Sequence, residues 1–188
     1  MKITSAKFVK GVKGSSDMPA DKMFQVAFIG RSNVGKSSVI NALTNQNNLA
    51  KTSSSPGRTT EINLFLINNS FYLVDLPGYG FAKTSLKNRE KLRKLIRWYL
   101  IESGLNQKKV FLIIDAELGP TKADMEVLAN FEETNKNIVV IANKIDKLKS
   151  SDYERAITGI KKIFTGYRII PFSAKKKIGI KELTSEIF

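Results

Sequence analysis

The residues with the clearest chemical potential form the run at 30–37, which has the spacing G-x-x-x-x-G-K-S of a phosphate-binding loop. Its glycines let the backbone curl so that N–H groups point at a triphosphate. Lys36 would reach the β- and γ-phosphates, and the hydroxyl of Ser37 would coordinate Mg²⁺. A glycine-rich turn of the same spacing also arises by chance. The apolar run before the loop and the amphipathic segment after it favour nucleotide binding.

A second motif, D-x-x-G, begins at Asp75, at the end of an apolar run. An aspartate there would hold Mg²⁺ through water. The N–H of Gly78 would contact a γ-phosphate, and this contact would be lost after hydrolysis. The pattern alone also describes ordinary turns, so the assignment depends on the position of the motif after the phosphate loop. Tyr79 stands where Ras-like proteins have the glutamine that orients the attacking water. Slow or partner-dependent hydrolysis is therefore expected, with switch II at about 75–85.

Residues 45–58 are rich in Ser, Asn, Thr and Pro, and they form a longer connection than compact domains usually contain. This position fits switch I, at about 47–61, in which a threonine completes the Mg²⁺ shell and contacts the γ-phosphate. Thr59 and Thr60 are both candidates. Plain turn chemistry is the alternative reading.

The apolar run at 138–142 ends in N-K-x-D. The carboxylate of Asp146 could accept hydrogen bonds from N1–H and the 2-amino group of guanine, donors that adenine does not offer there. Asn143 would brace the neighbouring loop, and the stem of Lys144 would lie on the base. The small residues within 172–174 would let a backbone N–H reach guanine O6.

The segments that must position these motifs alternate between strands and helices. Strands are predicted at about 3–12, 26–29, 62–66, 71–75, 110–115, 138–142 and 168–172, and helices at about 37–45, 87–101, 122–134 and 178–188. This order predicts a single α/β domain over residues 1–188, a P-loop GTPase-like, doubly wound and mainly parallel sheet with helices on both faces. Every motif falls at the carboxyl end of a strand, where such sheets bind ligands.

The chain contains no Cys and no His, which excludes disulfides, thiol nucleophiles and histidine general bases. Any metal must be bound by oxygen, which suits Mg²⁺. No apolar run approaches the ~20 residues of a membrane span, and the N-terminus has no signal-peptide core. We therefore expect a cytoplasmic protein that does not contact membranes, and nothing requires more than a monomer.

Net charge is the unusual quantity, with 31 Lys and Arg against 17 Asp and Glu, a balance of +14 and a pI near 9.9. Such a balance favours an RNA partner, although a lysine surplus can serve solubility alone. The basic residues of the predicted helix at 87–101 either face solvent or form an RNA or protein contact that depends on the nucleotide. The second reading gains support because this helix directly follows switch II.

Together these motifs resemble an Era-like small GTPase, and more narrowly the EngB family, also called YsxC or YihA, of bacterial ribosome-assembly GTPases. The resemblance covers almost the whole chain. It rests on Gly30-Arg-Ser-Asn-Val-Gly-Lys-Ser-Ser38, Ser55-Pro-Gly-Arg-Thr59, Asp75-Leu-Pro-Gly-Tyr-Gly-Phe-Ala-Lys83, Asn143-Lys-Ile-Asp146 and Phe172-Ser-Ala174.

The resemblance implies binding of GTP or GDP, with Mg²⁺ held by Ser37 and Thr59, and it assigns Lys36, Thr59 and Gly78 to catalysis. The nucleotide-binding residues that it implies are Gly30, Arg31, Ser32, Asn33, Val34, Gly35, Lys36, Ser37, Ser38, Gly57, Arg58, Thr59, Thr60, Glu61, Asp75, Leu76, Pro77, Gly78, Asn143, Lys144, Ile145, Asp146, Phe172, Ser173 and Ala174.

The implied partner is the large ribosomal subunit, through rRNA and ribosomal protein, with a role in division septum formation. Two functions remain open: a regulatory GTPase whose hydrolysis times its release from the assembling particle, and a nucleotide-gated RNA-binding module in which hydrolysis is incidental. An ATP-using kinase or ATPase would share only the phosphate loop, and Asp146 discriminates against it.

Overall fold

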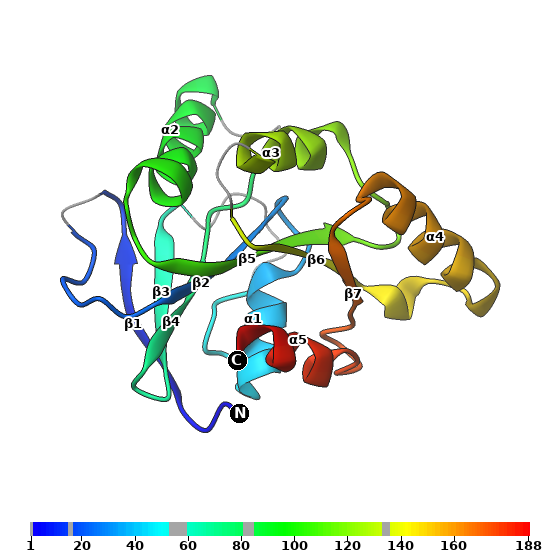
Figure 1. Cartoon of the computed structure of the whole chain (residues 1–188), viewed down its shortest axis with the longest axis horizontal. Helices are drawn as coiled ribbons and strands as arrows, with labels where there is room; N and C mark the ends of the chain where they lie inside the picture. The colour runs from blue at the N-terminus through cyan, green and yellow to red at the C-terminus, as the bar shows by residue number, and fades with distance from the viewer. Residues whose placement is uncertain (1, 15–16, 53–59, 81–84, 133–135) are drawn as a thin grey trace.

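A seven-stranded sheet forms the centre of the computed structural model, which describes residues 2–14, 17–52, 60–80, 85–132 and 136–188 (Figure 1). The strands lie in the order β1-β3-β4-β2-β5-β6-β7. β3 is antiparallel to both of its neighbours, whereas all pairs from β4 to β7 are parallel. The bounds are β1 Ala6–Val12, β2 Gln25–Gly30, β3 Ile62–Ile67, β4 Phe71–Asp75, β5 Gln107–Asp115, β6 Ile138–Asn143 and β7 Arg168–Pro171.

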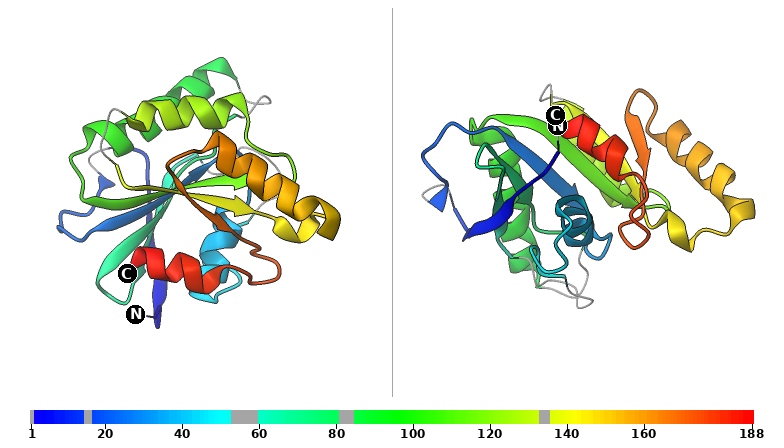
Figure 2. Two further views of the ribbon diagram at one scale, coloured as in Figure 1. Left: turned by 45° about the vertical axis from the view of Figure 1, so that its right-hand side comes forward. Right: turned by 90° about the horizontal axis from the view of Figure 1, so that it is seen from below.

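Helices cover both faces of this sheet, as predicted (Figures 1 and 2). Side chains of α1 and α5 pack into the apolar cluster on one face, and those of α2, α3 and α4 into the cluster on the other. The helices are α1 Lys36–Thr44, α2 Leu86–Arg97, α3 Lys122–Glu132, α4 Ser150–Ile163 and α5 Ile180–Ile187.

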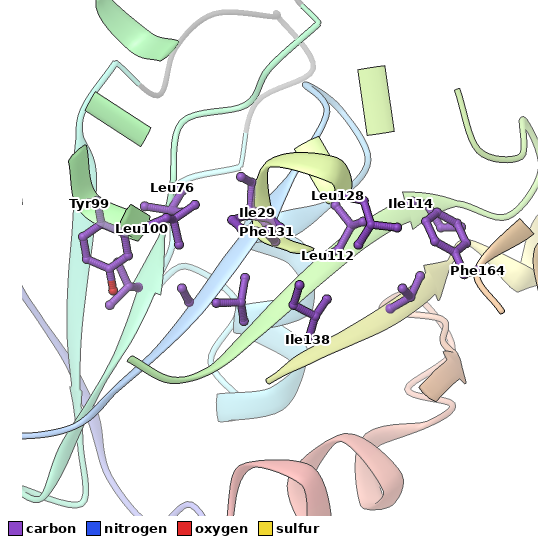
Figure 3. Packing of buried hydrophobic residues seen from close by; sticks show 14 of the residues in the cluster. Ile29, Leu76, Tyr99, Leu100, Leu112, Ile114, Leu128, Phe131, Ile138 and Phe164 are labelled. Carbon is purple, nitrogen blue, oxygen red and sulfur yellow. The ribbon is translucent and has the colours of Figure 1, made fainter. Parts of the chain in front are cut away.

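The central strands are buried from both sides, which explains their unbroken apolar sequences. All residues of β2, β4 and β6 are buried, as expected for parallel strands between two helical layers. Figure 3 shows one cluster, in which Ile29 and Leu112 of neighbouring strands lie beneath Leu128 and Phe131 of α3. These strands therefore give the loops at their carboxyl ends a rigid base.

Two elements differ from the prediction. The helix predicted at 87–101 ends at Arg97, and a π-helical turn, Trp98–Glu102, follows it. This turn lies over a buried polar contact, because the hydroxyl of Tyr99 donates to Gln25 Oε1 over 2.7 Å. Helix α4 was not predicted at all, although its apolar residues Ile157 and Ile160 face the core. No helix within the described ranges is long and apolar enough to cross a membrane.

Candidate functional site

The phosphate loop joins β2 to α1 and is shaped by left-handed backbone positions at Asn33, with φ 67°, and Gly35, with φ 99°. A Cβ atom at Gly30 would lie 2.4 Å from the carbonyl oxygen of Ile113, so only glycine fits beside β5. A Cβ atom at Gly35 would lie 2.5 Å from Nδ2 of Asn143. Both glycines of the motif are therefore required by close approach of neighbouring groups.

Lys36 lies inside this loop with only 8% of its surface exposed. Its Nζ donates to the carbonyl oxygens of Gly30, over 3.2 Å, and Arg31, over 3.4 Å. Burial lowers the pKa of the Lys36 ammonium, and the nearby carboxylate of Asp75 partly opposes this shift. An ammonium group has three donors, so the two carbonyls leave donor capacity for an anion in the loop.

Asp75 and Ser37 meet beside Lys36. Ser37 Oγ donates to Asp75 Oδ2 over 2.8 Å, while Asp75 Oδ1 is buried without a hydrogen-bond partner. Burial raises the pKa of the Asp75 carboxyl, against the opposing effects of Lys36 and of the hydrogen bond from Ser37. A buried acceptor without a partner is costly, and Mg²⁺ prefers oxygen ligands such as these. The donor set therefore fits Mg²⁺.

The N-K-x-D segment holds the phosphate loop from the side. Asn143 Nδ2 donates to the carbonyl oxygen of Val34 over 2.8 Å. Lys144 Nζ donates to the carbonyl oxygen of Asn33 over 2.7 Å and forms an ion pair of 2.7 Å with Asp115 Oδ2. The phosphate loop is therefore connected to β6 and β5 by side chains, and the expected bracing by Asn143 is present.

Asp146 lies at the rim of the adjacent pocket and is oriented by Ser173, whose Oγ donates to Asp146 Oδ1 over 2.5 Å. Ser173 Oγ in turn accepts from the N–H of Lys176 over 3.0 Å. The pocket has a volume of about 340 Å³. Its lining includes Gly35, Ser38, Asn41, Thr52, Asn143, Lys144, Asp146, Ala174, Lys175 and Lys177. The described residues thus bring the predicted base-reading groups and the phosphate loop to one side of one cavity.

Some predicted residues contribute no side chain to this site. Arg31 directs its side chain to Asp124 of α3, and the Glu61 carboxylate lies over Gly11 of β1. Val34, Leu76, Pro77, Ile145 and Phe172 are buried, so only their backbone groups could face a ligand. Thr60 is exposed, and the predicted residues Gly57, Arg58 and Thr59 lie outside the described part of the chain.

Asn41 is a pocket residue that the sequence reading missed. Its side chain accepts from the N–H of Ala50 over 2.7 Å and donates to the carbonyl oxygens of Asn47 and Ala50, at 3.0 and 2.8 Å. It therefore holds the first residues of predicted switch I. The available signal was an amide within the otherwise apolar stripe of α1. Lys177 also lines this pocket, and its Nζ donates to Asn45 Oδ1 over 2.7 Å.

The arrangement matches known proteins. A family model described as 50S ribosome-binding GTPase matches residues 25–144, and one described as elongation factor Tu GTP binding domain matches residues 101–188. The probable GTP-binding protein EngB of Clostridioides difficile (strain 630) is 42% identical over 190 residues, covering 100% of this chain and 93% of that protein. The corresponding protein of Acholeplasma laidlawii (strain PG-8A) is 39% identical, with coverage of 100% and 98%.

Solved structures agree with these matches. The crystal structure of a probable GTP-binding protein EngB superposes with a TM-score of 0.72 at 26% identity, covering 87% of this chain and 96% of that one. A structure of Era in complex with MgGDPNP and part of 16S ribosomal RNA gives 0.71 at 27% identity, with coverage of 89% and 56%. The expected fold and the GTPase assignment are confirmed, and the chain belongs to the EngB family of GTP-binding proteins.

Proposed function

We propose that this GTPase acts as an assembly factor for the large ribosomal subunit in the cytoplasm, with slow intrinsic GTP hydrolysis, and that normal cell division and septum formation require it. The observation that carries the proposal is the match of residues 25–144 to the family described as 50S ribosome-binding GTPase. The net charge of +14 suits a partner rich in phosphate.

Within this proposal each group of the site has its own role in binding GTP and Mg²⁺. Lys36 would bind the β- and γ-phosphates, Ser37 and Asp75 would hold Mg²⁺, and the Gly78 amide would contact the γ-phosphate. Bound Mg²⁺ would neutralise charge that develops on the phosphate oxygens. Tyr79 has no side-chain amide like the glutamine of Ras, which favours slow hydrolysis in the absence of a partner.

A nucleotide-gated RNA-binding module, in which hydrolysis is incidental, is the second candidate. Helix α2 favours it, because this helix follows switch II and exposes Lys87, Lys91 and Arg93. Multiple-turnover hydrolysis with and without large subunits separates the two candidates. If the subunits never accelerate hydrolysis, the hypothesis of a regulatory GTPase has no mechanism for timed release.

Co-sedimentation with large ribosomal subunits tests the partner, in GTP-analogue, GDP and nucleotide-free states across a salt series. We expect binding in the GTP-analogue state to exceed that in the other states and to persist near physiological salt. Charge-driven adhesion alone would fall steeply with salt and ignore the nucleotide. That result would leave a GTPase whose partner is not the ribosome.

Matched charge variants locate the contact. Removing the cations Lys87, Lys91 and Arg93 of α2 by substitution with Ala should weaken subunit binding by about tenfold or more. The control removes the same charge from the exposed residues Lys149, Lys161 and Lys162 at and near α4, and should change binding by less than about threefold. Equal losses in both variants would show that no specific contact involves α2.

Removal of Mg²⁺ tests the metal site. Chelation should accelerate GDP release from the wild-type protein by about tenfold or more, because the Mg²⁺-mediated link between phosphate and protein oxygens is lost. Ser37→Ala should release GDP fast with or without Mg²⁺. The measurement is the dissociation rate of a fluorescent GDP derivative. A Ser37→Ala protein that keeps the wild-type response to chelation would remove Ser37 from the metal site.

A further inference from the structure

A buried carboxylate outside the nucleotide pocket joins three functional elements. Asp124, in the first turn of α3, is fully buried. Its Oδ1 accepts over 2.6 Å from the hydroxyl of Tyr79, the residue directly after the D-x-x-G motif. Its Oδ2 lies 3.4 Å from Nε of Arg31, in the phosphate loop. The phosphate loop, the start of switch II and α3 therefore converge on one side chain.

Capping of α3 explains only half of these contacts. Asp124 Oδ2 accepts from both the N–H and the hydroxyl of Thr121, over 2.8 and 2.7 Å. Thr121 precedes the helix, so this is a capping arrangement that satisfies donors at its N-terminus. The other oxygen, Oδ1, is used by Tyr79, 45 residues earlier in the chain. Oδ2 thus combines the cap of α3 with the ion pair to Arg31, whereas Oδ1 accepts from Tyr79.

The contact with Tyr79 fixes the backbone beside the predicted γ-phosphate contact. The carbonyl oxygen of Tyr79 accepts from the N–H of Ser32 over 3.0 Å, and Arg31 and Tyr79 pair as a parallel bridge. Gly78 is pressed against the same loop, since a Cβ atom there would lie 2.9 Å from the backbone nitrogen of Ser32. Tyr79 is thus held to the phosphate loop by its backbone and to α3 by its side chain.

Gly80 follows Tyr79 and also contacts the phosphate loop. It has φ of +72°, a conformation that glycine adopts freely, and it lies over the stem of Arg31. The Tyr79 hydroxyl already donates to Asp124, and its ring is partly buried. Burial raises the pKa of this hydroxyl above the ordinary value, and Asp124 adds to the shift. Tyr79 is therefore built to hold backbone in place rather than to orient water.

We propose that Asp124 is a positioning residue for GTP: through Tyr79 it holds the Gly78 amide against the phosphate loop, where that amide meets the γ-phosphate. The proposal rests on the GTP site described above. It adds to that site a carboxylate that acts through Tyr79 and does not itself contact the nucleotide. GDP has no γ-phosphate, so loss of this positioning should affect GTP and leave GDP binding unchanged.

Tyr79→Phe is the primary test, because it removes one hydroxyl and keeps both the ring and the cap of α3. We expect its affinity for a non-hydrolysable GTP analogue to fall about ten- to 100-fold, the range that corresponds to one hydrogen bond to a charged group. Its affinity for GDP should stay within about twofold of wild type. Calorimetry with each nucleotide gives the ratio of the two affinities.

Tyr72→Phe is the matched control, because Tyr72 also donates its hydroxyl to a carboxylate, Asp21 Oδ2, over 2.7 Å. Neither residue belongs to the nucleotide pocket, so the ratio of GTP-analogue to GDP affinity should not change. A lowered ratio in this control would show that a general loss of rigidity in the protein changes the ratio, and it would overturn the proposal. So would an unchanged ratio in Tyr79→Phe.

A double-mutant cycle with Asp124→Asn tests whether Tyr79 acts through this carboxylate. Once Asp124 is changed, Tyr79→Phe should lower the affinity ratio little further, since contacting residues are not additive. Fully additive effects would overturn the assignment of Asp124. A wild-type protein that binds neither nucleotide would instead overturn the GTP site on which the proposal rests, so the two failures are distinguishable.

Discussion

Lys36→Ala should weaken GTP binding by about 100-fold or more. The ammonium of Lys36 is buried and is aimed by two carbonyl oxygens of its own loop, Gly30 O and Arg31 O. Burial lowers its pKa, and a bound anion in the loop would stabilise the charged ammonium. The truncated side chain would leave the β- and γ-phosphates without their charged donor. Equilibrium titration with a fluorescent GTP analogue measures the loss.

The folded state of this variant needs its own measurement. Asp75 would lose its neighbouring cation in a buried environment, and breaking such a pair destabilises a protein. Thermal unfolding of the nucleotide-free variant therefore accompanies the titration. Lys94→Ala is the control, since Lys94 pairs with Glu90 on the exposed face of α2 and should bind GTP as the wild type does. A folded Lys36→Ala protein with wild-type affinity would refute the phosphate-loop assignment.

The local motifs were predictable because each encodes a backbone shape at the end of a strand. Gly30 and Gly35 are required by contacts within a few ångströms, and Asp75 and Asn143 are the last residues of buried strands. Apolar runs located these strands, and the rule that ligands bind at their carboxyl ends placed the motifs together. Fold and pocket therefore followed from short-range patterns.

The side-chain contacts that could not be predicted from the sequence join residues that lie far apart in the chain. The direction of the Arg31 side chain and the contact between Tyr79 and Asp124 join residues far apart in sequence. An acidic residue in the first turn of a helix reads as an ordinary cap, so nothing in the pattern around Asp124 distinguished it. Helix α4 was missed although its buried positions, Ile157 and Ile160, have the i, i+3 spacing of an amphipathic helix.

Asp146→Asn should change the preferred base from guanine to xanthine. The Asp146 carboxylate would accept from N1–H and the 2-amino group of guanine, and Ser173 already fixes Oδ1 by donating to it. In the variant this hydroxyl would keep an oxygen at Oδ1 and turn the new amide N–H₂ toward position 2 of the base. Guanine presents a donor there, so two donors would oppose each other. Xanthine presents a carbonyl oxygen, which restores the pair.

We expect GTP affinity to fall by about 100- to 1,000-fold and xanthosine triphosphate to become the better ligand. Competition between the two triphosphates for the same protein sample measures the preference directly. Asp152→Asn, which removes a carboxylate paired with Arg155 on α4, is the matched control and should keep guanine selectivity. Ser173→Ala distinguishes orientation from base reading: it should weaken GTP binding about tenfold without any gain for xanthine. Retained guanine selectivity in Asp146→Asn would show that the base is read elsewhere, because an amide cannot accept both guanine donors.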